Sequence, residues 1–236
     1  MTTAGESALE TRTAGRTPLL AGLDDEIIEA FVRHARQRRY AHGSVIFHKD
    51  DPGSLLYVII SGKVKISMPS MDGKDLVLNI LSAGESFGEM ALFDEQPRSA
   101  SAEAMDDAVT LTLGRPDFMG LLERYPALAM RVIELLTRRL RATDALAQDA
   151  SLLDLPGRLA RRLLELAETY GEGDIRKGPI VVNLKLTQTE LAALVGATRV
   201  ATNRVLQRMQ QRGVIAWEPQ RITLKKPADL RKMAVI

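Results

Sequence analysis

The chain of 236 residues contains no cysteine, which excludes disulfides, cysteine-ligated zinc and iron–sulfur clusters. Aromatic side chains are also scarce, at 4% of the residues. No long apolar run is present: the longest covers residues 55–60, far fewer than the ~20 residues that cross a membrane. The first 17 residues contain no apolar signal core. We therefore expect a soluble, cytoplasmic protein that does not bind a membrane.

The charges are divided unevenly along the chain. The formal net charge is only +2, but residues 151–236 contain 15 Lys and Arg against 8 Asp and Glu, a net of +7. The residues before them carry 17 basic and 22 acidic side chains, a net of −5. A nearly neutral chain with one basic end is typical of a protein that presents only that end to a polyanion such as DNA. Chance clustering of solvated charges is the alternative.

Hydrophobic periodicity divides the chain into a β-rich part and a helical part. We expect a mobile tail over residues 1–17, because nothing there could contribute to a core, and a helix over residues 23–36. Residues 38–113 alternate apolar and polar side chains in short runs, with glycines between them at intervals of roughly ten residues. This pattern predicts a jelly-roll-like β-roll domain over residues 18–124 within an α+β protein. Such a scaffold binds ligands more often than it catalyses reactions.

A long helical pattern follows, from residue 116 to residue 154. It contains apolar or small side chains spaced alternately three and four residues apart, which is the a/d pattern of two paired helices. The seam comprises Ile133, Leu136, Leu140, Thr143 and Ala147. We predict a dimerisation helix over residues 125–153 and a homodimer, with a stripe buried inside one chain as the alternative. Asp154 and Pro156 favour a new helix start, so we predict a domain boundary at residue 154.

The first candidate site follows a glycine turn in the β-rich part. It comprises Gly88, Glu89, Met90 and Ala91, followed by Arg98 and Ser99. A glycine turn lets the backbone approach a ligand closely and presents N–H groups that attract phosphate. A guanidinium and a hydroxyl suit phosphate oxygens, whereas the Glu89 carboxylate needs a donor such as a ribose hydroxyl. These groups suit a nucleotide with a singly charged phosphate, although a purely structural loop can contain the same residue types.

The second candidate site lies in the basic end of the chain, over residues 187–213. Thr187 and Glu190 have capping-box spacing, and Gly196 allows a sharp turn before a second helix. Several residues at the helix starts and on the side of the second helix that does not face the core can contact DNA. They are Thr187, Gln188, Thr198, Arg199, Val200, Asn203, Arg204 and Arg208. We predict a winged helix-turn-helix domain over residues 154–236, whose second helix enters the major groove. An ordinary helical hairpin is the alternative.

Both sites resemble those of the cAMP receptor protein and fumarate-nitrate regulator family. The resemblance covers residues from about 19 to 224, and the motif that carries it is Gly88-Glu89-Met90-Ala91-Leu92 with Arg98-Ser99-Ala100. It implies that Glu89 holds the ribose hydroxyl of cAMP, with the cyclic phosphate on Arg98 and Ser99. It also implies that Thr143 contacts adenine, that Arg199 and Arg204 bind DNA, and that RNA polymerase is a partner.

The chain departs from the family pattern at two positions. Asp144 follows the adenine-contacting threonine, where a small hydroxyl or polar residue is common, and its charge must be desolvated to meet a base. Val200 stands where Glu is often found; it cannot accept a hydrogen bond from cytosine, although it can contact a thymine methyl. These departures bear on the base of the effector and on the sequence of the DNA site.

We therefore predict a non-enzymatic, cAMP-responsive homodimer that binds a near-palindromic DNA site and contains no metal. The sequence shows no nucleophile–base arrangement and no metal-ligand spacing. A member of the same family with another effector, or none, is one alternative. A haem sensor is a further one, although His34, His42 and His48 are scattered. From a different class, a cyclic-nucleotide module that regulates an enzyme or channel is possible, but the basic end argues against it.

Overall fold

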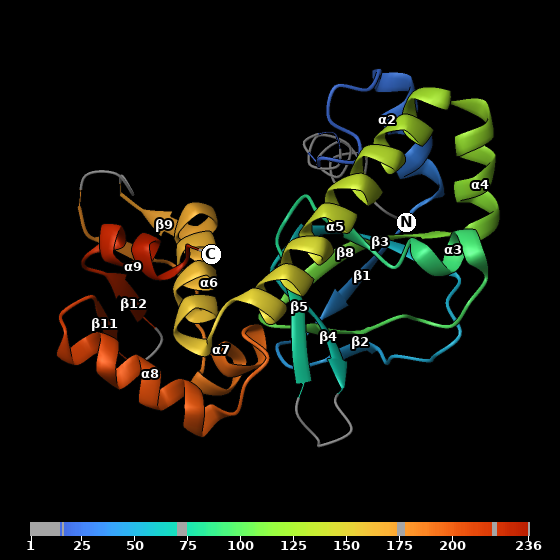
Figure 1. Cartoon of the computed structure of the whole chain (residues 1–236). Coiled ribbons are helices and arrows are strands. Elements are labelled where there is room, and N and C mark those ends of the chain that lie inside the picture. The colour runs from blue at the N-terminus through green and yellow to red at the C-terminus, as the bar shows by residue number, and fades with distance from the viewer. Residues whose placement is uncertain (1–14, 16, 70–74, 174–177, 219–220, 236) are drawn as a thin grey trace. The chain divides into compact units, whose positions relative to one another are not determined.

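The structure is a computed structural model that describes residues 15, 17–69, 75–173, 178–218 and 221–235 (Figure 1). The chain forms two compact units, one from residues 1–69 and 78–142 and the other from residues 70–77 and 143–236. Most of the expected tail, residues 1–14 and 16, lies outside the described residues. Thr17, expected to end the tail, is fully buried, and its carbonyl accepts hydrogen bonds from Leu20 and Ala21. The described part of the first unit thus includes Thr17.

Two four-stranded sheets form the framework of the first unit. One has the order β1-β8-β3-β6 and consists of β1 (Arg36–Tyr40), β3 (Leu55–Ser61), β6 (Ser86–Phe87) and β8 (Ala108–Gly114). The other has the order β2-β7-β4-β5 and consists of β2 (Val45–Phe47), β4 (Val64–Pro69), β5 (Asp75–Leu81) and β7 (Ser101–Ala104). The predicted jelly-roll-like architecture is therefore confirmed. The strand β1, rich in arginine, was not evident from alternation because four of its five residues are exposed and the fifth is only half-buried.

Helices cover one end of these sheets and complete the core (Figure 1). They are α2 (Asp25–His34), the short α3 (Met90–Asp94), α4 (Arg115–Arg124) and the first turns of α5 (Pro126–Leu152). Phe31 of α2, Phe118 of α4 and Leu128 of α5 are each at most 1% exposed and pack in one apolar cluster with the sheet. The single helix expected from residue 116 is in fact two helices. Pro126 causes the break, because a proline disfavours helical backbone in the residue before it.

The described residues of the second unit combine the end of α5 and four further helices with a small sheet of order β11-β12-β10-β9. Its elements are α6 (Leu155–Tyr170), β9 (Gly171–Glu172), β10 (Ile180–Val182), α7 (Gln188–Leu194), α8 (Arg199–Gln211), β11 (Ile215–Glu218), β12 (Arg221–Leu224) and α9 (Pro227–Met233). As predicted, Asp154 caps α6, and its Oδ1 accepts a hydrogen bond from the Gly157 amide at 2.9 Å. The expected strand through Leu186 ends at Val182, although Leu186 itself is buried.

Candidate functional site

The glycine turn of the first unit surrounds the Arg98 side chain. Gly88 has φ +84°, and a Cβ there would lie 2.7 Å from Arg98 Nη1 and 2.9 Å from the Leu55 carbonyl oxygen. Gly53, on the facing loop, is equally constrained, since its Cβ would lie 2.6 Å from that of Ala91 and 2.8 Å from Arg98 Nε. Neither position has space for a Cβ, and Gly88 also has a backbone conformation that other residues rarely adopt.

Arg98 is buried, with only 5% of its surface exposed. Its Nη1 donates to the Gly88 carbonyl at 2.7 Å and its Nη2 to the Leu55 carbonyl at 2.9 Å. The guanidinium also lies over the Phe47 ring, 4.3 Å from the centroid, a favourable cation–π position. Burial lowers the pKa of Arg98, but a guanidinium remains charged at physiological pH. Its Nε is buried without a hydrogen-bond partner among the described residues.

Glu89 is the acidic counterpart of Arg98 and is only 2% exposed. Its Oε1 forms an ion pair with Arg139 of α5, and Arg139 also donates to the carbonyl of Ser86. The other oxygen, Oε2, is buried with no partner in the described part of the chain. The turn therefore contains one unsatisfied acceptor and one unsatisfied donor, on Glu89 and Arg98. Buried polar atoms are usually paired, so these two atoms are candidates to bind a ligand; Ser86 Oγ, two residues before Gly88, is also buried without a partner among the described residues.

Sequence reasoning did not assign Arg139 to the site. It lies four residues before Thr143, one turn away on the same side of α5. This four-residue spacing from Thr143 is the feature of the sequence that could have identified Arg139 as a site residue. The ion pair with Arg139 fixes the direction of the buried Glu89 carboxylate.

The other residues predicted for the effector are more exposed. Met90 is 50% exposed and its sulfur accepts a hydrogen bond from the Ser99 hydroxyl at 3.5 Å, whereas Ala91 is buried. Thr143 and Asp144 are exposed on α5. The structure thus brings the buried side chains of Glu89 and Arg98 together beside half-buried Gly88 and leaves the base-contacting candidates at a surface.

The predicted dimer seam is exposed apart from one residue. Ile133 is 53% and Leu140 62% exposed, and Thr143 and Ala147 are exposed as well. Leu136 instead packs against the core of its own unit, beside buried Val132. Met130, 56% exposed, lies three residues before Ile133 and extends the exposed apolar row. Leu136 is thus half-buried within its own unit and contributes less exposed surface to the predicted seam than Ile133 and Leu140.

Local hydrogen bonds shape the helix-turn-helix as the sequence predicts. Thr187 Oγ1 accepts from the Glu190 amide at 3.1 Å, and the Thr187 amide donates to Glu190 Oε2 at 2.7 Å, which completes the capping box. Gly196 has φ +61° in the turn. Thr198 then caps α8 by accepting from the Ala201 amide at 3.2 Å.

Two arginines of α6 that the sequence did not single out hold the end of α7. Arg158 Nε donates to the Val195 carbonyl at 3.2 Å, and Arg162 Nε donates to the Leu194 carbonyl at 3.4 Å. These carbonyls belong to the last turn of a helix, where no intrahelical donor is available. The two side chains therefore fix the turn that precedes α8.

The residues predicted to face DNA fall into two groups. Val200 is 62% exposed, and Arg199, Arg204 and Arg208 are also exposed. Asn203, by contrast, is half-buried and its amide donates to Gln188 Oε1 at 2.7 Å. This bond ties α8 to α7, so in this structure these two amides bind each other. The opposite side of α8 buries Val205, Leu206 and Met209.

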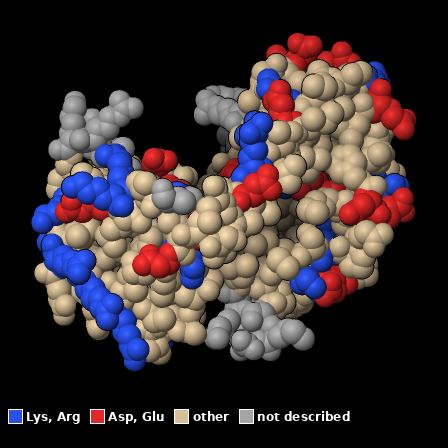
Figure 2. Space-filling view, viewed as in Figure 1, with Lys and Arg blue, Asp and Glu red and all other residues tan. Residues whose placement is uncertain are grey.

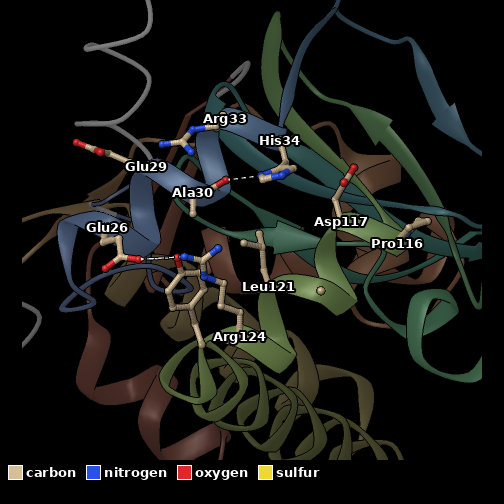
Figure 3. A pocket seen from close by; sticks show the side chains of 11 residues that line it. Glu26, Glu29, Ala30, Arg33, His34, Pro116, Asp117, Leu121 and Arg124 are labelled. Atoms are coloured by element: carbon tan, nitrogen blue, oxygen red, sulfur yellow. Dashed lines mark hydrogen bonds and ion pairs between the residues drawn. The ribbon is translucent and has the colours of Figure 1, made fainter.

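A separate cavity of about 360 Å³ lies between α2 and α4 (Figure 3). Its walls contain both acidic and basic side chains, among them Glu29, Arg33 and Asp117. The Tyr125 hydroxyl donates to Glu26 Oε1 at 2.9 Å at its edge, and this hydrogen bond raises the pKa of Tyr125. The cavity includes none of the residues that surround Arg98 and Glu89.

The described ranges contain neither a helix that could span a membrane nor a candidate metal site. Every helix there is too short or too polar to span a bilayer. No group of three or more His, Asp or Glu side chains in those ranges could hold a metal ion.

Comparison with known protein families matches both halves of the chain. Residues 37–125 match the cyclic nucleotide-binding domain, and residues 157–233 match the Crp-like helix-turn-helix domain. A CRP-like cAMP-activated global transcriptional regulator of Mycobacterium tuberculosis is 32% identical over 93% of this chain and 97% of its own. The chain belongs to the cAMP receptor protein and fumarate-nitrate regulator family. It is thus a transcription regulator of the type that combines a cyclic-nucleotide-binding domain with a DNA-binding helix-turn-helix.

Other members of the family are similar over most of their length. The cyclic AMP receptor protein of Thermus thermophilus is 35% identical over 92% of this chain and 97% of its own. Among solved structures, the c-di-GMP responsive global regulator CLP of Xanthomonas campestris has a TM-score of 0.76 and 28% identity, and covers 86% of this chain and 99% of its own. Relatives are therefore named for different cyclic nucleotides, so membership alone does not identify the effector.

Proposed function

We propose that this regulator binds cAMP and, as a homodimer, recognises a near-palindromic DNA site together with RNA polymerase. The observation that carries the effector proposal is the pair of unsatisfied buried atoms, Glu89 Oε2 and Arg98 Nε. A ribose hydroxyl can donate to the first, and a cyclic phosphate oxygen can accept from the second. The residues present therefore fit a cyclic nucleotide.

The remaining contacts of the effector follow from the family pattern. Ser99 adds a hydroxyl for the phosphate, Met90 and Ala91 contribute the turn, and Thr143 and Asp144 meet the base. When cAMP binds, it supplies the missing donor and acceptor and satisfies both buried atoms. A ligand that binds one conformation of the protein more tightly than another shifts the population toward that conformation. If that conformation also binds DNA more tightly, the effector raises DNA affinity.

The dimer and DNA proposals rest on two exposed faces. Ile133, Leu140 and Met130 present an apolar row on α5, which a second copy of α5 would cover. Two α8 helices related by a two-fold axis would then read half-sites about one helical turn apart on one side of the duplex. Val200 and Arg204 lie four residues apart on α8, where both can reach base edges.

A regulator that responds to a cyclic dinucleotide is the second candidate function. The likeness to the c-di-GMP responsive regulator CLP favours it, as does Asp144, whose exposed carboxylate can accept from a guanine as well as from an adenine.

Calorimetric titration of the purified protein with cAMP, cGMP and c-di-GMP separates these candidates. We expect saturable binding of cAMP with one site per chain, and a selection of random duplexes that yields a near-palindromic motif more efficiently when cAMP is present. Binding of c-di-GMP alone would replace the effector in this proposal. No binding of any of the three, together with selection that is independent of them, would refute an effector at this site.

A further inference from the structure

The helix α8 carries a one-sided set of charges. Arg199, Arg204 and Arg208 lie within it and Arg212 is its C-cap residue, and the helix contains no Asp or Glu. All four arginines are exposed. None of them has an ion pair or a side-chain hydrogen bond within the part of the chain that the structure describes. By contrast, Arg161 and Arg162 of the neighbouring α6 are both hydrogen-bonded to protein groups.

The spacing of these residues arranges them as a row that winds around the helix. Val200, Arg204, Arg208 and Arg212 follow one another at intervals of four residues. Each interval advances about 6 Å along the axis and turns about 40° around it. Relative to Val200, Arg208 is therefore turned by about 80° and Arg212 by about 120°. Figure 2 shows a diagonal row of basic side chains across the surface where Figure 1 places α8.

The rest of the second unit fixes the orientation of this row. Val205, Leu206 and Met209 are buried, which directs the side of α8 that holds Val200 and Arg204 outward. Arg208 and Arg212 lie progressively toward the flank of the helix. At the far end of the helix, Gln210 Oε1 accepts from the Trp217 amide at 2.9 Å and joins α8 to β11. The end of α8 near Arg212 is therefore held by a strand.

Like charges four residues apart destabilise a helix, so an uncompensated row of arginines favours an anionic partner. The length of α8 indicates where that partner lies. Its 13 residues extend about 20 Å, which exceeds the width of the major groove, about 12 Å. If the first turns face the bases, the last turns lie against the wall of the groove, where the phosphates are.

We propose that Arg208 and Arg212 bind phosphates that flank the major groove, whereas Val200 and Arg204 face the bases. This inference rests on the proposed DNA-binding function and adds a contact that is independent of base sequence. The partner is specifically the DNA backbone. Arg212, which the sequence had not suggested as a DNA contact, becomes part of the interface.

The experiment measures how DNA affinity depends on salt for the parent and for the double variant Arg208→Gln/Arg212→Gln. Each neutralised phosphate contributes about 0.9 to the slope of log K against log salt. Two residues in each of two protomers give about four phosphates, so we expect the slope to decrease by about 3.6. Between 50 and 200 mM salt, the affinity of the parent should fall about 150-fold more than that of the variant.

Three further measurements make the result specific. The variant should select the same DNA motif as the parent, because phosphates carry no sequence information. It should also bind cAMP as the parent does and melt at the same temperature or higher, because like-charge repulsion is reduced. Lys232→Gln is the matched control, since it removes one charge from α9 of the same unit and should leave the slope almost unchanged.

The outcomes distinguish this inference from the proposed function. An unchanged salt slope, in a parent that binds its selected motif, refutes the phosphate contacts and leaves DNA binding intact. A changed motif in the double variant refutes them too, because the arginines would then read bases. If the parent selects no duplex with or without cAMP, the proposed function and this inference are both wrong.

Discussion

The substitution Arg98→Lys tests the effector site most directly, because it retains the charge and removes the planar fork. In the structure, two nitrogens of Arg98 bind the carbonyls of Gly88 and Leu55, at 2.7 and 2.9 Å. The third, Nε, is buried and has no partner within the described residues. A lysine ammonium is a single point and cannot bind both carbonyls and a phosphate in the directions of a guanidinium. We therefore expect the ligand contact to be lost while most of the fold remains.

The magnitude follows from the number of bonds that each substitution removes. A hydrogen bond to a charged group contributes about 1.5–3 kcal/mol, so the loss of one ligand bond should weaken cAMP binding roughly 10- to 150-fold. Arg98→Leu removes all the hydrogen bonds of the guanidinium, including the two to half-buried backbone carbonyls. These two bonds contribute about 0.5–1.5 kcal/mol each, so we expect the substitution to lower the free energy of unfolding by about 1–3 kcal/mol.

The assays are calorimetric titration with cAMP and urea unfolding of each variant. Arg115→Lys is the matched control: Arg115 Nε donates to the Leu92 carbonyl at 2.8 Å, but no atom of that residue belongs to the buried group around Glu89. The control should bind cAMP like the parent. If Arg98→Lys also binds like the parent, then the unpaired Nε does not mark a phosphate site, and the reasoning is wrong.

Three further substitutions test the dimer, the DNA contact and a buried carboxyl. Leu140→Glu, at a position 62% exposed, should produce a monomer in analytical ultracentrifugation without reducing the free energy of unfolding; a dimeric variant would contradict the seam. Val200→Glu restores a hydrogen-bond acceptor and should shift the selected DNA motif toward a cytosine at one symmetric position; identical motifs would show that residue 200 does not face the bases. Burial raises the pKa of Glu85, so the folded protein holds that proton more tightly than the unfolded chain and loses stability as pH rises above the usual carboxyl range. Glu85→Gln should therefore raise the melting temperature more at about pH 7 than at about pH 4, and an equal change at both would contradict this.

The features that could be predicted from the sequence depend on near neighbours in the chain. The Thr187–Glu190 capping box and the Asp154 cap each join groups three residues apart, so spacing alone is sufficient to identify them. The strands of the first unit are evident where one face is buried and the other is not. The strand β1 was missed for the same reason, because its side chains are almost all exposed.

The features that could not be predicted depend on contacts between distant residues. Heptad spacing shows that Leu136 lies on an apolar stripe, but it does not reveal whether the stripe meets the same chain or a second copy. In the structure Leu136 packs against its own core and Leu140 does not. Likewise, Asn203 has the residue type and position of a base reader, yet its amide binds Gln188, 15 residues earlier.

The charges of the buried effector group suggest which nucleotides it can accept. Glu89 contributes one negative charge, and Arg139 and Arg98 contribute one positive charge each, so the group has a net charge of about +1 because guanidinium groups stay protonated. A cyclic mononucleotide has a single negative charge on its phosphate and makes the group neutral. The phosphate of 5′-AMP carries close to two negative charges at neutral pH, and the excess must be buried beside Glu89 without a partner. We therefore expect 5′-AMP to bind at least 100-fold more weakly than cAMP, on the order of 3 kcal/mol. Calorimetric competition between the two nucleotides measures this ratio. Equal affinities would show that the phosphate does not lie in the buried group formed by Arg98 and Glu89.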